Sequence, residues 1–562
     1  MRIISILMAV LLAACSAKNS ADLILKGGPI YTNNPEKPTV EAVVVSGDTI
    51  MFAGTISEAL TYQGKQTKVI DLKGKMMTPG LIEGHGHIMG LGYNEMNLDL
   101  MGIKNFDAIV EEVRKKVSAS KPGEWIVGRG WHQDKWDSRP SKMIKGFPTH
   151  DLITAAAPDN PVVLKHASGH NILVNLKAMQ MAGINATATE KIDVPVGGEI
   201  IRDELGNPTG LFNETAAQLI TDVMPAPSEE SDRKALELAI AACHRNGITS
   251  FQSAGEDQKV IDLIEKLKRE NLLGVRMYVM LSGTDRELVN QYFKSGPLID
   301  KWLTIRSIKL YGDGALGSRG AWLLEPYSDR ANHYGQPNMI MDSVYSVSKR
   351  ALQSGLQVCT HAIGDRANRE VLNQYEKAFN DNPSAAKNAR FRIEHAQHLH
   401  PDDIGRFAKL GVLPAMQAIH LSSDRPWAID RLGQQRIIDG AYVWKKLIDS
   451  GATIINGSDV PVEPINPIAS FYASVTRKTL KGEPENGYES EQVMTREQAL
   501  RSYTIDAAYG AFEEKLKGSI QVGKLADFTV FSKDLMTISE NEILTTEVVM
   551  TIVGGKVFFE KK

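Results

Sequence analysis

The stretch MTPGLIEGHGH, residues 77–87, decides how the rest of the sequence is interpreted. Its apolar residues follow a Pro-Gly turn and stop at polar residues, a pattern typical of a short buried strand. His85 and His87 stand at the end of this run, where both side chains can reach one metal ion, and Gly86 leaves room for close backbone approach. The pair alone is a weak signal, because the chain holds a second one, His398-Leu399-His400, which we interpret as incidental at a helix start.

Seven further apolar runs repeat this pattern downstream. Each stops at a polar residue or a glycine, and helical periodicity separates one run from the next. The runs cover residues 247–255, 275–281, 305–314, 356–365, 390–396, 411–417 and 452–459. Nearly continuous apolar strands that alternate with helices indicate a parallel sheet covered on its outer face, and eight strands are the number that a closed barrel needs. We therefore predict an α/β fold with a (β/α)8 TIM-like barrel over residues 76–511.

The two chain ends differ from the predicted barrel in their pattern of apolar and polar residues. Residues 22–75 and 512–562 form short runs of alternating apolar and polar residues with glycine and asparagine between them. Neither end is long enough to bury a two-sided core, so we predict that both pair in one small β-sandwich. The gap from residue 85 to residue 247 is far longer than the ~30 residues of a single βαβ unit. It predicts a large structured insertion after the first barrel strand, at about 122–225, that could cap the barrel mouth.

Composition and charge exclude some classes of function. The formal net charge is -3, hydrophobic residues make up 43% and charged residues 23% of the chain, and no long basic run occurs. This is ordinary globular composition without the electrostatic footprint of a nucleic-acid-binding protein. We expect a small-molecule substrate and no nucleic acid. The sequence leaves the oligomeric state open, and a homodimer is one option.

The first 21 residues form a processing segment rather than part of the fold. Arg2 precedes an apolar run, 3–13, that is too short to span a membrane as a stable helix. The run ends at Leu12-Ala13-Ala14-Cys15, which resembles the bacterial lipobox, where a lipid-modified cysteine becomes the mature N-terminus. We predict a signal peptide over 1–14, a linker over 15–21 and a lipid anchor on Cys15 in the cell envelope, preferably the periplasm-facing outer membrane. An ordinary cleaved signal or a short buried helix is the alternative.

The remaining cysteines, Cys243 and Cys359, lie in apolar runs. A cysteine in such a run usually behaves as a small buried hydrophobe, so we assign both to packing. A disulfide is the alternative in an oxidising compartment, although two lone cysteines are weak support for one.

Further metal-ligand types stand at the ends of other predicted strands. His361 and His395 end the fifth and sixth strands, and the carboxyl ends of all barrel strands meet at one face. A lone histidine there is more often structural, but four in matching positions make that explanation poor, and imidazole suits zinc and similar metals. Asp459 ends the eighth strand, where it can ligate a metal and accept a proton from activated water. The alternative role of Asp459 is to cap the N-terminus of the next helix.

Lys309, on the fourth predicted strand, is the sharpest candidate. A protonated lysine offers only donors and cannot bind a cation. After carboxylation by carbon dioxide, the side chain becomes an anion whose two oxygens can bridge two metal ions. The alternative is a buried lysine paired with Asp313 or another carboxylate.

This order of residues, His-x-His, Lys, His, His and Asp on strands one, four, five, six and eight, resembles the binuclear members of the amidohydrolase superfamily. Other segments look like amidohydrolase family 3, the branch that includes the N-substituted formamide deformylases. These segments are GRGWHQ, LKHASGH, NPTGLFNETA, KLYGDGALGSR, HAIGD, RIEHAQ, GSDVPV and VGKLADFTVFS. The similarity runs from about residue 22 to the C-terminus.

The resemblance implies a ligand for each position of a binuclear centre. His85, His87 and Asp459 would hold one metal ion, His361 and His395 the other, and carboxylated Lys309 would bridge them. The implied metals are two zinc ions, with iron or manganese as alternatives, and one metal with a structural Lys309 is a further alternative. Candidate substrate contacts are Trp131, His132, His170 and Asp313. Core packing of the insertion is an equal alternative for the first three, and relatives often have GWDQ where this chain has Trp131-His132-Gln133.

The sequence thus predicts a metal-dependent amidohydrolase. It would hydrolyse a C–N bond in an amide, an N-formyl group or a cyclic amide through metal-activated hydroxide, with Asp459 as the catalytic acid–base. Hydrolysis of an ester, a lactone or an organophosphate is the alternative, because the metal ligands act on the electrophile and do not select the leaving group. A lipid-anchored binding protein on an inactive scaffold is a third interpretation, against which six intact ligand positions argue.

Overall fold

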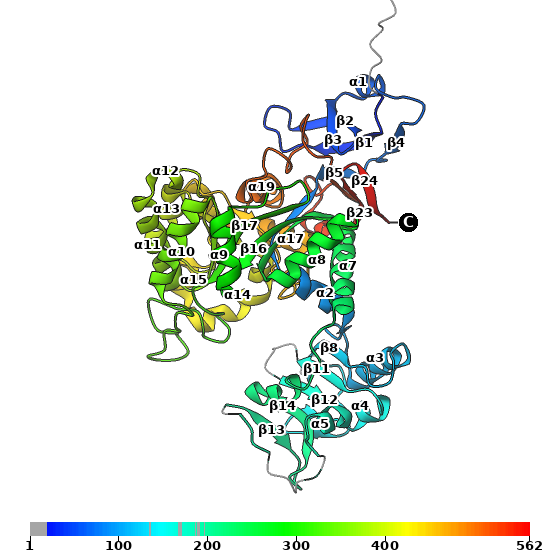
Figure 1. Cartoon of the computed structure of the whole chain (residues 1–562), viewed down its shortest axis with the longest axis vertical. Coiled ribbons are helices and arrows are strands. Elements are labelled where there is room, and N and C mark those ends of the chain that lie inside the picture. Colours follow the sequence, from blue (N-terminus) through cyan, green and yellow to red (C-terminus); the bar gives the residue numbers. More distant parts are fainter. Residues whose placement is uncertain are drawn as a thin grey trace, which may run out of the picture. The chain divides into compact units, whose positions relative to one another are not determined.

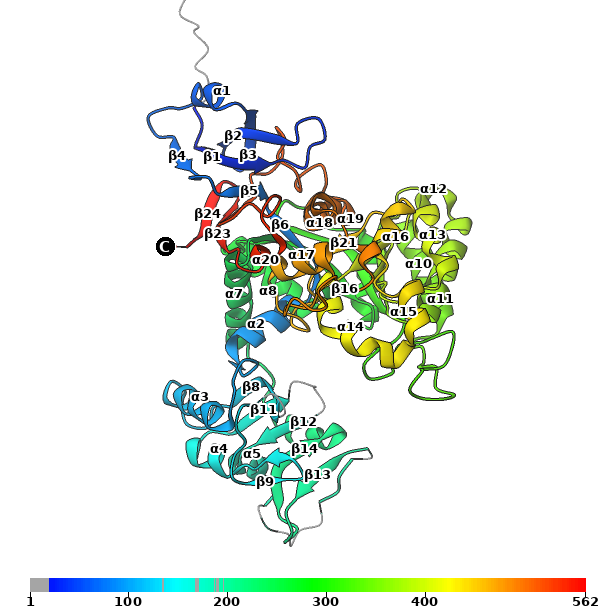
Figure 2. The same cartoon turned by 180° about the vertical axis from the view of Figure 1, so that it is seen from behind.

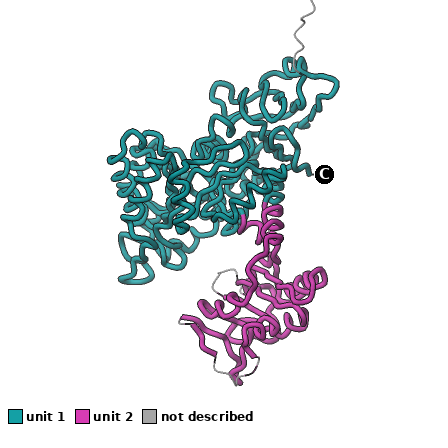
Figure 3. Tube along the Cα trace, viewed as in Figure 1, with its two compact units in different colours: residues 1–88, 240–562 teal, residues 89–239 magenta. Residues whose placement is uncertain are grey.

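The computed structural model describes residues 20–133, 136–166, 171–185, 187, 192–195 and 197–561. Cys15, the signal segment around it and His170 lie outside the described residues. Within the described part, no helix is both long enough and apolar enough to cross a membrane. The chain divides into two compact units, Met1–Ile88 with Ile240–Lys562 and Met89–Ala239, which Figure 3 shows in teal and magenta.

The first unit contains eight parallel strands that pair in chain order (Figures 1 and 2). They are β6 (Leu81–Gly86), β15 (Ile248–Glu256), β16 (Arg276–Ser282), β17 (Leu303–Tyr311), β18 (Gln357–Ala362), β19 (Arg392–His395), β20 (Leu413–Met416) and β21 (Ile455–Asn456). Each coincides with one of the eight apolar runs in the sequence. The parallel sheet is nearly closed, and this confirms the predicted TIM-like α/β barrel.

Helices follow the barrel strands and cover the outside of the sheet (Figure 1). They are α7 (Glu229–Arg245), α8 (Gln258–Arg269), α9 (Arg286–Ser295), α10 (Met341–Ser354), α11 (Asp365–Asp381), α12 (Pro383–Ala386), α13 (Pro401–Leu410), α14 (Ala418–Leu432), α15 (Gln434–Gly440), α16 (Trp444–Asp449), α17 (Pro467–Thr476), α18 (Arg496–Ser502) and α19 (Ile505–Gly510). The sequence of α8 explains why it forms: the Asp257 side chain accepts a hydrogen bond from the backbone NH of Val260, and Ile261, Ile264 and Leu267 are buried at helical spacing.

The two described cysteines are free and buried, as the packing assignment expected. Cys359 lies in a small apolar cluster with Ala254, Tyr278 and Met280, which come from neighbouring barrel strands. Cys243 is on α7 and is fully buried. Both therefore act as small core side chains.

Strands from both chain ends form one sheet beside the barrel, in the order β24-β23-β22-β5-β1-β2-β3, with β4 paired to β1. The strands are β1 (Leu23–Tyr31), β2 (Thr39–Ser46), β3 (Thr49–Gly54), β4 (Lys68–Asp71), β5 (Met76–Pro79), β22 (Phe528–Phe531), β23 (Val548–Val553) and β24 (Lys556–Glu560). Two short helices, α1 (Ile56–Leu60) and α20 (Glu540–Ile543), interrupt them. The hydrogen bonds run through a single sheet, so the layers of the predicted sandwich are not separate sheets. The junction between the chain ends is the antiparallel pair β5 and β22.

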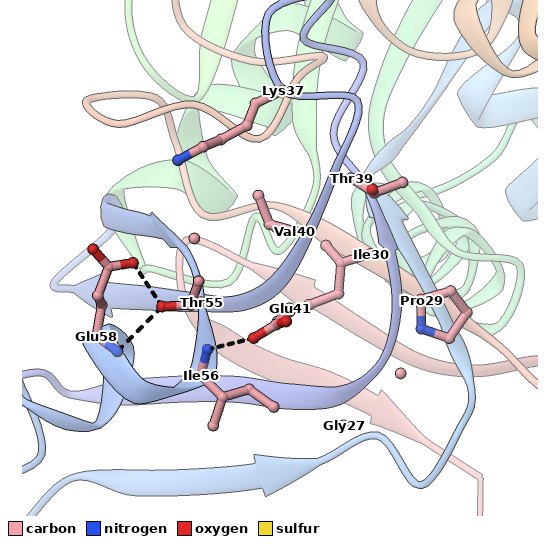
Figure 4. A pocket seen from close by; sticks show the side chains of 12 residues that line it. Gly27, Pro29, Ile30, Lys37, Thr39, Val40, Glu41, Thr55, Ile56 and Glu58 are labelled. Atoms are coloured by element: carbon pink, nitrogen blue, oxygen red, sulfur yellow. Dashed lines mark hydrogen bonds between the residues drawn. The ribbon is translucent and has the colours of Figure 1, made fainter.

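A hollow of about 700 Å³ lies on the N-terminal part of this sheet, between the start of β2 and α1 (Figure 4). Its polar groups satisfy one another: the Thr55 hydroxyl donates to Glu58, at 2.6 Å, and the backbone NH of Ile56 donates to Glu41, at 3.0 Å. The hollow therefore presents few uncommitted groups to a ligand.

The second unit has its own sheet and core. Its six strands lie in the order β13-β14-β12-β11-β8-β7. The strands are β7 (Leu98–Asp99), β8 (Ile126–Trp131), β11 (Val162–His166), β12 (Asn171–Val174), β13 (Glu199–Arg202) and β14 (Pro208–Asn213), with the pair β9 (Met143–Ile144) and β10 (Phe147–Pro148) apart. The helices are α3 (Phe106–Ser118), α4 (Asp151–Ala156), α5 (Leu176–Met181) and α6 (Gln218–Thr221), and α2 (Ile88–Met96) begins at its border. The unit, Met89–Ala239, is wider than the range 122–225 expected from the sequence.

Candidate metal centre

His85 and His87 lie at the end of β6, and their backbone is fixed by close packing. A Cβ atom at Gly86 would approach the Phe251 ring to 2.7 Å, which explains the glycine between the two histidines. The His87 Nδ1–H donates to the Ala254 carbonyl, at 3.0 Å. Because the other ring nitrogen, Nε2, then carries the lone pair, it is available as a ligand.

Asp459 completes a three-residue group with these histidines. Its Oδ1 lies 3.3 Å from His87 Nε2 and 3.6 Å from His85 Nε2. In the part of the chain that the structure describes, these three residues are the one group of histidine, cysteine or acidic side chains close enough together to hold a metal ion. The next helix, α17, has Asn466 as its N-cap, so the capping alternative for Asp459 is wrong. Asp459 has a left-handed backbone, φ 59°, as does His395, φ 74°, a conformation that is costly for side-chain-bearing residues and clusters at functional sites.

Lys309, His361 and His395 lie against this group. The Lys309 Nζ is 3.1 Å from His85 Nε2, and the ring centroid of His395 is 5.0 Å from that of His85 and 4.4 Å from that of His361. Lys309 is only 1% exposed, yet no carboxylate among the described residues forms an ion pair with it. The alternative of a Lys309–Asp313 pair is therefore wrong. The fold brings all six predicted ligand positions to one mouth of the barrel.

A buried ion pair orients His85. Its Nδ1–H donates to the Glu394 carboxylate in a short hydrogen bond, and the Arg392 guanidinium holds that carboxylate from the other side at 2.7 and 2.8 Å. Burial alone would raise the pKa of Glu394, but the charge of Arg392 and the hydrogen bond from His85 lower it, so the carboxylate stays ionised. This carboxylate–histidine arrangement points Nε2 of His85 into the site. Arg392 and Glu394 were not predicted as site residues. Two charged residues at alternating positions of an apolar strand, RIEH, are nevertheless an unusual pattern that could have indicated them.

His395 is oriented in the same way by a neutral partner. Its Nδ1–H donates to Oε1 of Gln417, at 2.7 Å, from the turn after β20. Gln417 was not predicted either, because an amide at the end of the seventh predicted run, 411–417, is not a typical metal ligand.

The imidazoles are held in their neutral forms. Burial lowers the pKa of His85 to about 4 and that of His361 to about 3, helped in both cases by the nearby Lys309 ammonium. Burial also puts the pKa of His395 well below its usual value. Neutral imidazole is the form that binds a metal ion.

Among the described residues that lie against Asp459 and His395, Nε2 of His361 and Nε2 of His420 are buried and have no hydrogen-bond partner. An unpaired buried polar atom is costly and calls for an explanation such as an ion. Neutral imidazoles with free nitrogens, one ionised carboxylate and a buried lysine form a nitrogen and oxygen donor set that fits a divalent metal of the zinc type.

Asp313 forms hydrogen bonds with the backbone of the loops around the site. Its carboxylate accepts hydrogen bonds from the backbone NH groups of Ile363, Gly364 and Trp322, at 2.8 to 2.9 Å, and its side chain is buried. We therefore assign Asp313 to the positioning of these loops rather than to substrate contact. Two of these NH groups follow directly after β18, the strand that carries His361, so this interaction supports the metal centre.

The candidates of the second unit have their own surroundings. Trp131 is 1% exposed in the core of that unit, and its indole NH donates to the Leu164 carbonyl at 2.8 Å. Trp131 therefore has the packing role that was the alternative to substrate contact. The His132 ring lies 4.6 Å from the His166 ring. A substrate contact of His132 stays a prediction.

Two further polar side chains at the barrel mouth were not foreseen. Tyr311 follows Lys309 by two residues on β17, and its ring centroid is 6.3 Å from that of His361. Residues two apart on a strand face the same way, so strand alternation could have predicted its position. His420 lies on α14, with Nε2 3.9 Å from Oδ2 of Asp459. His420 was not predicted as a site residue, because a histidine within a helix is most often a packed core residue.

Comparisons with known proteins agree with this centre. A model of the amidohydrolase family matches residues 68–559. Protein LONG AFTER FAR-RED 3 of Arabidopsis thaliana is 31% identical over 95% of this chain and 91% of that protein. The N-substituted formamide deformylase of Arthrobacter pascens is 25% identical over 96% of this chain and 98% of the enzyme.

A solved structure supports the same assignment. An uncharacterized metal-dependent hydrolase from Pyrococcus furiosus superposes with a TM-score of 0.73 at 27% identity, covering 92% of this chain and all of that one. The barrel, the histidine–aspartate group at its mouth and a family match over most of the sequence agree. The chain belongs to the amidohydrolase family and has the fold and site of a metal-dependent hydrolase.

Proposed function

We propose that this hydrolase cleaves a carbon–nitrogen bond in an amide, an N-formyl group or a cyclic amide. The observation that carries the proposal is an ionised aspartate, Asp459, among neutral imidazoles at the barrel mouth. Similarity along the whole chain to a formamide deformylase supports this bond type over others.

The residues that would hold metal form two sets. His85, His87 and Asp459 would hold one ion, and His361 and His395 a second. When bound, such ions polarise a carbonyl group and make water nucleophilic at neutral pH. The free nitrogen of His361 and the fixed tautomers of His85, His87 and His395 support this assignment.

We propose that Lys309 is carboxylated and bridges the two sets. Burial lowers the pKa of Lys309, although the charges of Glu394 and Asp459 oppose the change, so the neutral amine is more accessible than usual. The neutral Nζ can attack carbon dioxide, forming an N–C bond and releasing one proton, and the product is a carboxylate. The oxygens of this anion could bind the metal ions that the neutral imidazoles would hold, which an ammonium group cannot do.

Asp459 would move the proton during hydrolysis. Burial alone would raise the pKa of Asp459, but its contacts with the surrounding histidines, His87 first, hold it well below its usual value. The carboxylate is therefore ionised at neutral pH and can accept a proton from the attacking water. It can then give that proton to the leaving nitrogen, which needs one in order to depart as an amine.

The test is metal analysis of the purified protein beside a panel of N-formyl, N-acyl, cyclic amide, ester, lactone and phosphotriester substrates. We expect about two metal ions per chain, turnover of the C–N substrates, and loss of turnover on chelation. Asp459→Asn serves as the inactive control. Faster hydrolysis of the ester, lactone or phosphotriester substrates would replace the proposed bond type. Metal below one ion per chain with no turnover would favour a binding protein instead.

A further inference from the structure

Three side chains, two from a helix and one from a loop, form a wall beside the metal centre, and we call them the acidic wall: His420, Asp424 and Glu463. His420 and Asp424 are four residues apart on α14, so they share one face of that helix. Glu463 follows Asp459 by four residues in the loop after β21. The ends of barrel strands seven and eight thus supply the wall.

The two carboxylates have no cationic partner. In the described part of the chain, neither Asp424 nor Glu463 forms an ion pair with lysine or arginine, although both are half-buried. Asp424 receives only neutral donors, the Ser423 hydroxyl at 3.2 Å and the Gln397 amide at 3.3 Å. Burial raises the pKa of both carboxyl groups, which means that the ionised forms are under-compensated in the free protein. A half-buried acid of this kind gains most from an added positive charge.

His420 gives an independent sign that the wall faces a ligand. Its ring is 6% exposed, and its Nε2 has no hydrogen-bond partner. This atom lies 3.9 Å from Oδ2 of Asp459, and the His420 ring also interacts electrostatically with Asp424 and Glu463. His420 therefore links the wall to the site where the reacting bond must lie.

The wall differs from the metal centre in its composition. The one group of three or more ligands among the described residues that is compact enough for a metal ion is His85, His87 and Asp459, and neither wall carboxylate belongs to it. Carboxylates without a cationic partner suit an organic cation, whose ammonium or guanidinium group donates several hydrogen bonds.

We propose that Asp424 and Glu463 bind a positively charged group of the substrate, so that the enzyme prefers amides bearing an ammonium or guanidinium group near the bond that is cleaved. The inference rests on the proposed function for the reaction, but the charge preference can be measured separately. The two carboxylates are specificity residues and not catalytic ones.

The first experiment compares matched N-acyl amines of equal length that end in ammonium, methyl or carboxylate, with the end group on either the amine or the acyl side. We expect kcat/KM for the ammonium compound to exceed that of its methyl analogue by roughly tenfold or more, the scale of a hydrogen-bonded charge pair. The double variant Asp424→Asn/Glu463→Gln should lose this preference, so that its kcat/KM values for the ammonium and methyl compounds become equal. Asp430→Asn, on the exposed side of the same helix, is the matched control.

The second experiment separates the two proposals. Binding of 1,4-diaminobutane to the purified, metal-containing protein is measured by titration calorimetry. We expect the wild type and Asp430→Asn to bind it and the double variant to bind at least tenfold more weakly. Binding without amide hydrolysis would reject the proposed function and leave the acidic wall in place. Hydrolysis with no charge preference and no diamine binding would contradict the proposal that the acidic wall binds a cationic group. A further divalent ion that is lost in the double variant would also contradict it.

Discussion

At the scale of single residues, Lys309 is the most unusual side chain of the site. It is fully enclosed, it lies 3.1 Å from a histidine nitrogen, and no described carboxylate pairs with it. An ammonium group in that position would be poorly compensated, since burial of an unpaired charge is costly. Carboxylation would remove the ammonium charge and add two oxygens from carbon dioxide that could bind metal ions.

Replacing Lys309 by alanine should therefore remove metal as well as charge. We expect Lys309→Ala to hold less than half the wild-type metal and to lose at least about a hundredfold in kcat/KM, the scale on which loss of a metal-site group acts. Acetate or propionate at high concentration should restore part of both. Metal content is measured by elemental analysis and turnover with the best substrate of the panel. A Lys309→Ala variant with full metal and full activity would show that the lysine is only structural.

His398 allows a pH prediction that does not depend on the metal. Its ring is 3% exposed, neither ring nitrogen has a partner, and burial lowers the pKa of His398 from 6.5 to about 3. Between these values the unfolded chain binds more protons than the folded one, so stability falls as pH decreases from 6.5 toward 3. His398→Phe should lose less stability between pH 7 and pH 4 than the wild type, by on the order of 2–3 kcal/mol.

The comparison uses urea unfolding with chelator present, so that loss of metal does not contribute. His400→Asn, a partly exposed neighbour at the N-cap of α13, should keep the wild-type pH dependence. Equal pH dependence in His398→Phe and the wild type would mean that the buried ring is not the source.

The residues that could be predicted from the sequence are those whose type is unusual at a strand end. Histidine, lysine and aspartate at the ends of apolar runs stand out, and all six lie together. Arg392, Glu394 and Gln417 could not be assigned, because their importance depends on which strand lies opposite. The position of His420 depends on the direction in which α14 continues from β20. A single sequence does not reveal that direction.

At the scale of elements, the seam between the first and last barrel strands is the informative feature. β21 pairs with β20, and no strand ladder joins it to β6. The Glu83 carboxylate bridges the seam instead, accepting the Ser458 NH at 2.7 Å, the Ser458 hydroxyl at 2.8 Å and the His85 NH at 3.1 Å. A Cβ at Gly84 would lie 2.3 Å from the Asn456 carbonyl, so the two strands approach closely only because of this glycine.

The seam predicts different results for two substitutions of Glu83. Glu83→Ala leaves three buried donors without an acceptor, at about 1–3 kcal/mol for each. We expect it to melt several degrees lower and to retain less metal, because β6 carries His85 and the loop after β21 carries Asp459. Burial raises the pKa of Glu83 to about 8, so neutral glutamine is a close mimic and Glu83→Gln should be close to wild type. Differential scanning calorimetry and metal analysis check both, and equal behaviour of the two variants would contradict the bridge.

Element positions followed from the sequence because apolar runs and polar ends are local signals, and each of the eight barrel strands overlaps one predicted run. The extent of the second unit did not follow. Its helix α3 has an apolar face, Phe106, Ile109, Val110 and Val113, but helical periodicity does not say which of two cores a helix joins.

At the scale of the whole molecule, the barrel is fastened to the sheet of the chain ends by a buried ion pair. The Arg276 guanidinium donates to both oxygens of Asp527, at 2.7 and 3.0 Å, and Arg276 is 1% exposed. Both partners are hydrogen-bonded in a bidentate arrangement, the geometry in which a buried pair repays its desolvation best. The sequence predicted that the ends meet, since neither has a core of its own.

We also propose that the chain is anchored to a membrane by a lipid on Cys15. Cys15→Ser removes the thiol that would carry the lipid, so the variant should leave the membrane fraction and appear with the dissolved proteins of the envelope. Fractionation and intact-mass measurement check this, with Cys243→Ala, a buried core position, as the control that should stay attached. A Cys15→Ser protein that still sediments with membranes, or a wild type without added acyl mass, would reject the anchor.

The contact between β5 and β22 also has a consequence for biosynthesis. The Leu81 NH and the Thr529 hydroxyl beside this contact are hydrogen-bonded although 448 residues separate them. A ribosome therefore exposes the edge of β5 long before its partner emerges, and unpaired strand edges are prone to aggregation. A premature stop codon near residue 520 would leave nearly every barrel residue in place and still yield insoluble protein, because the missing strand is the one that covers the waiting edge.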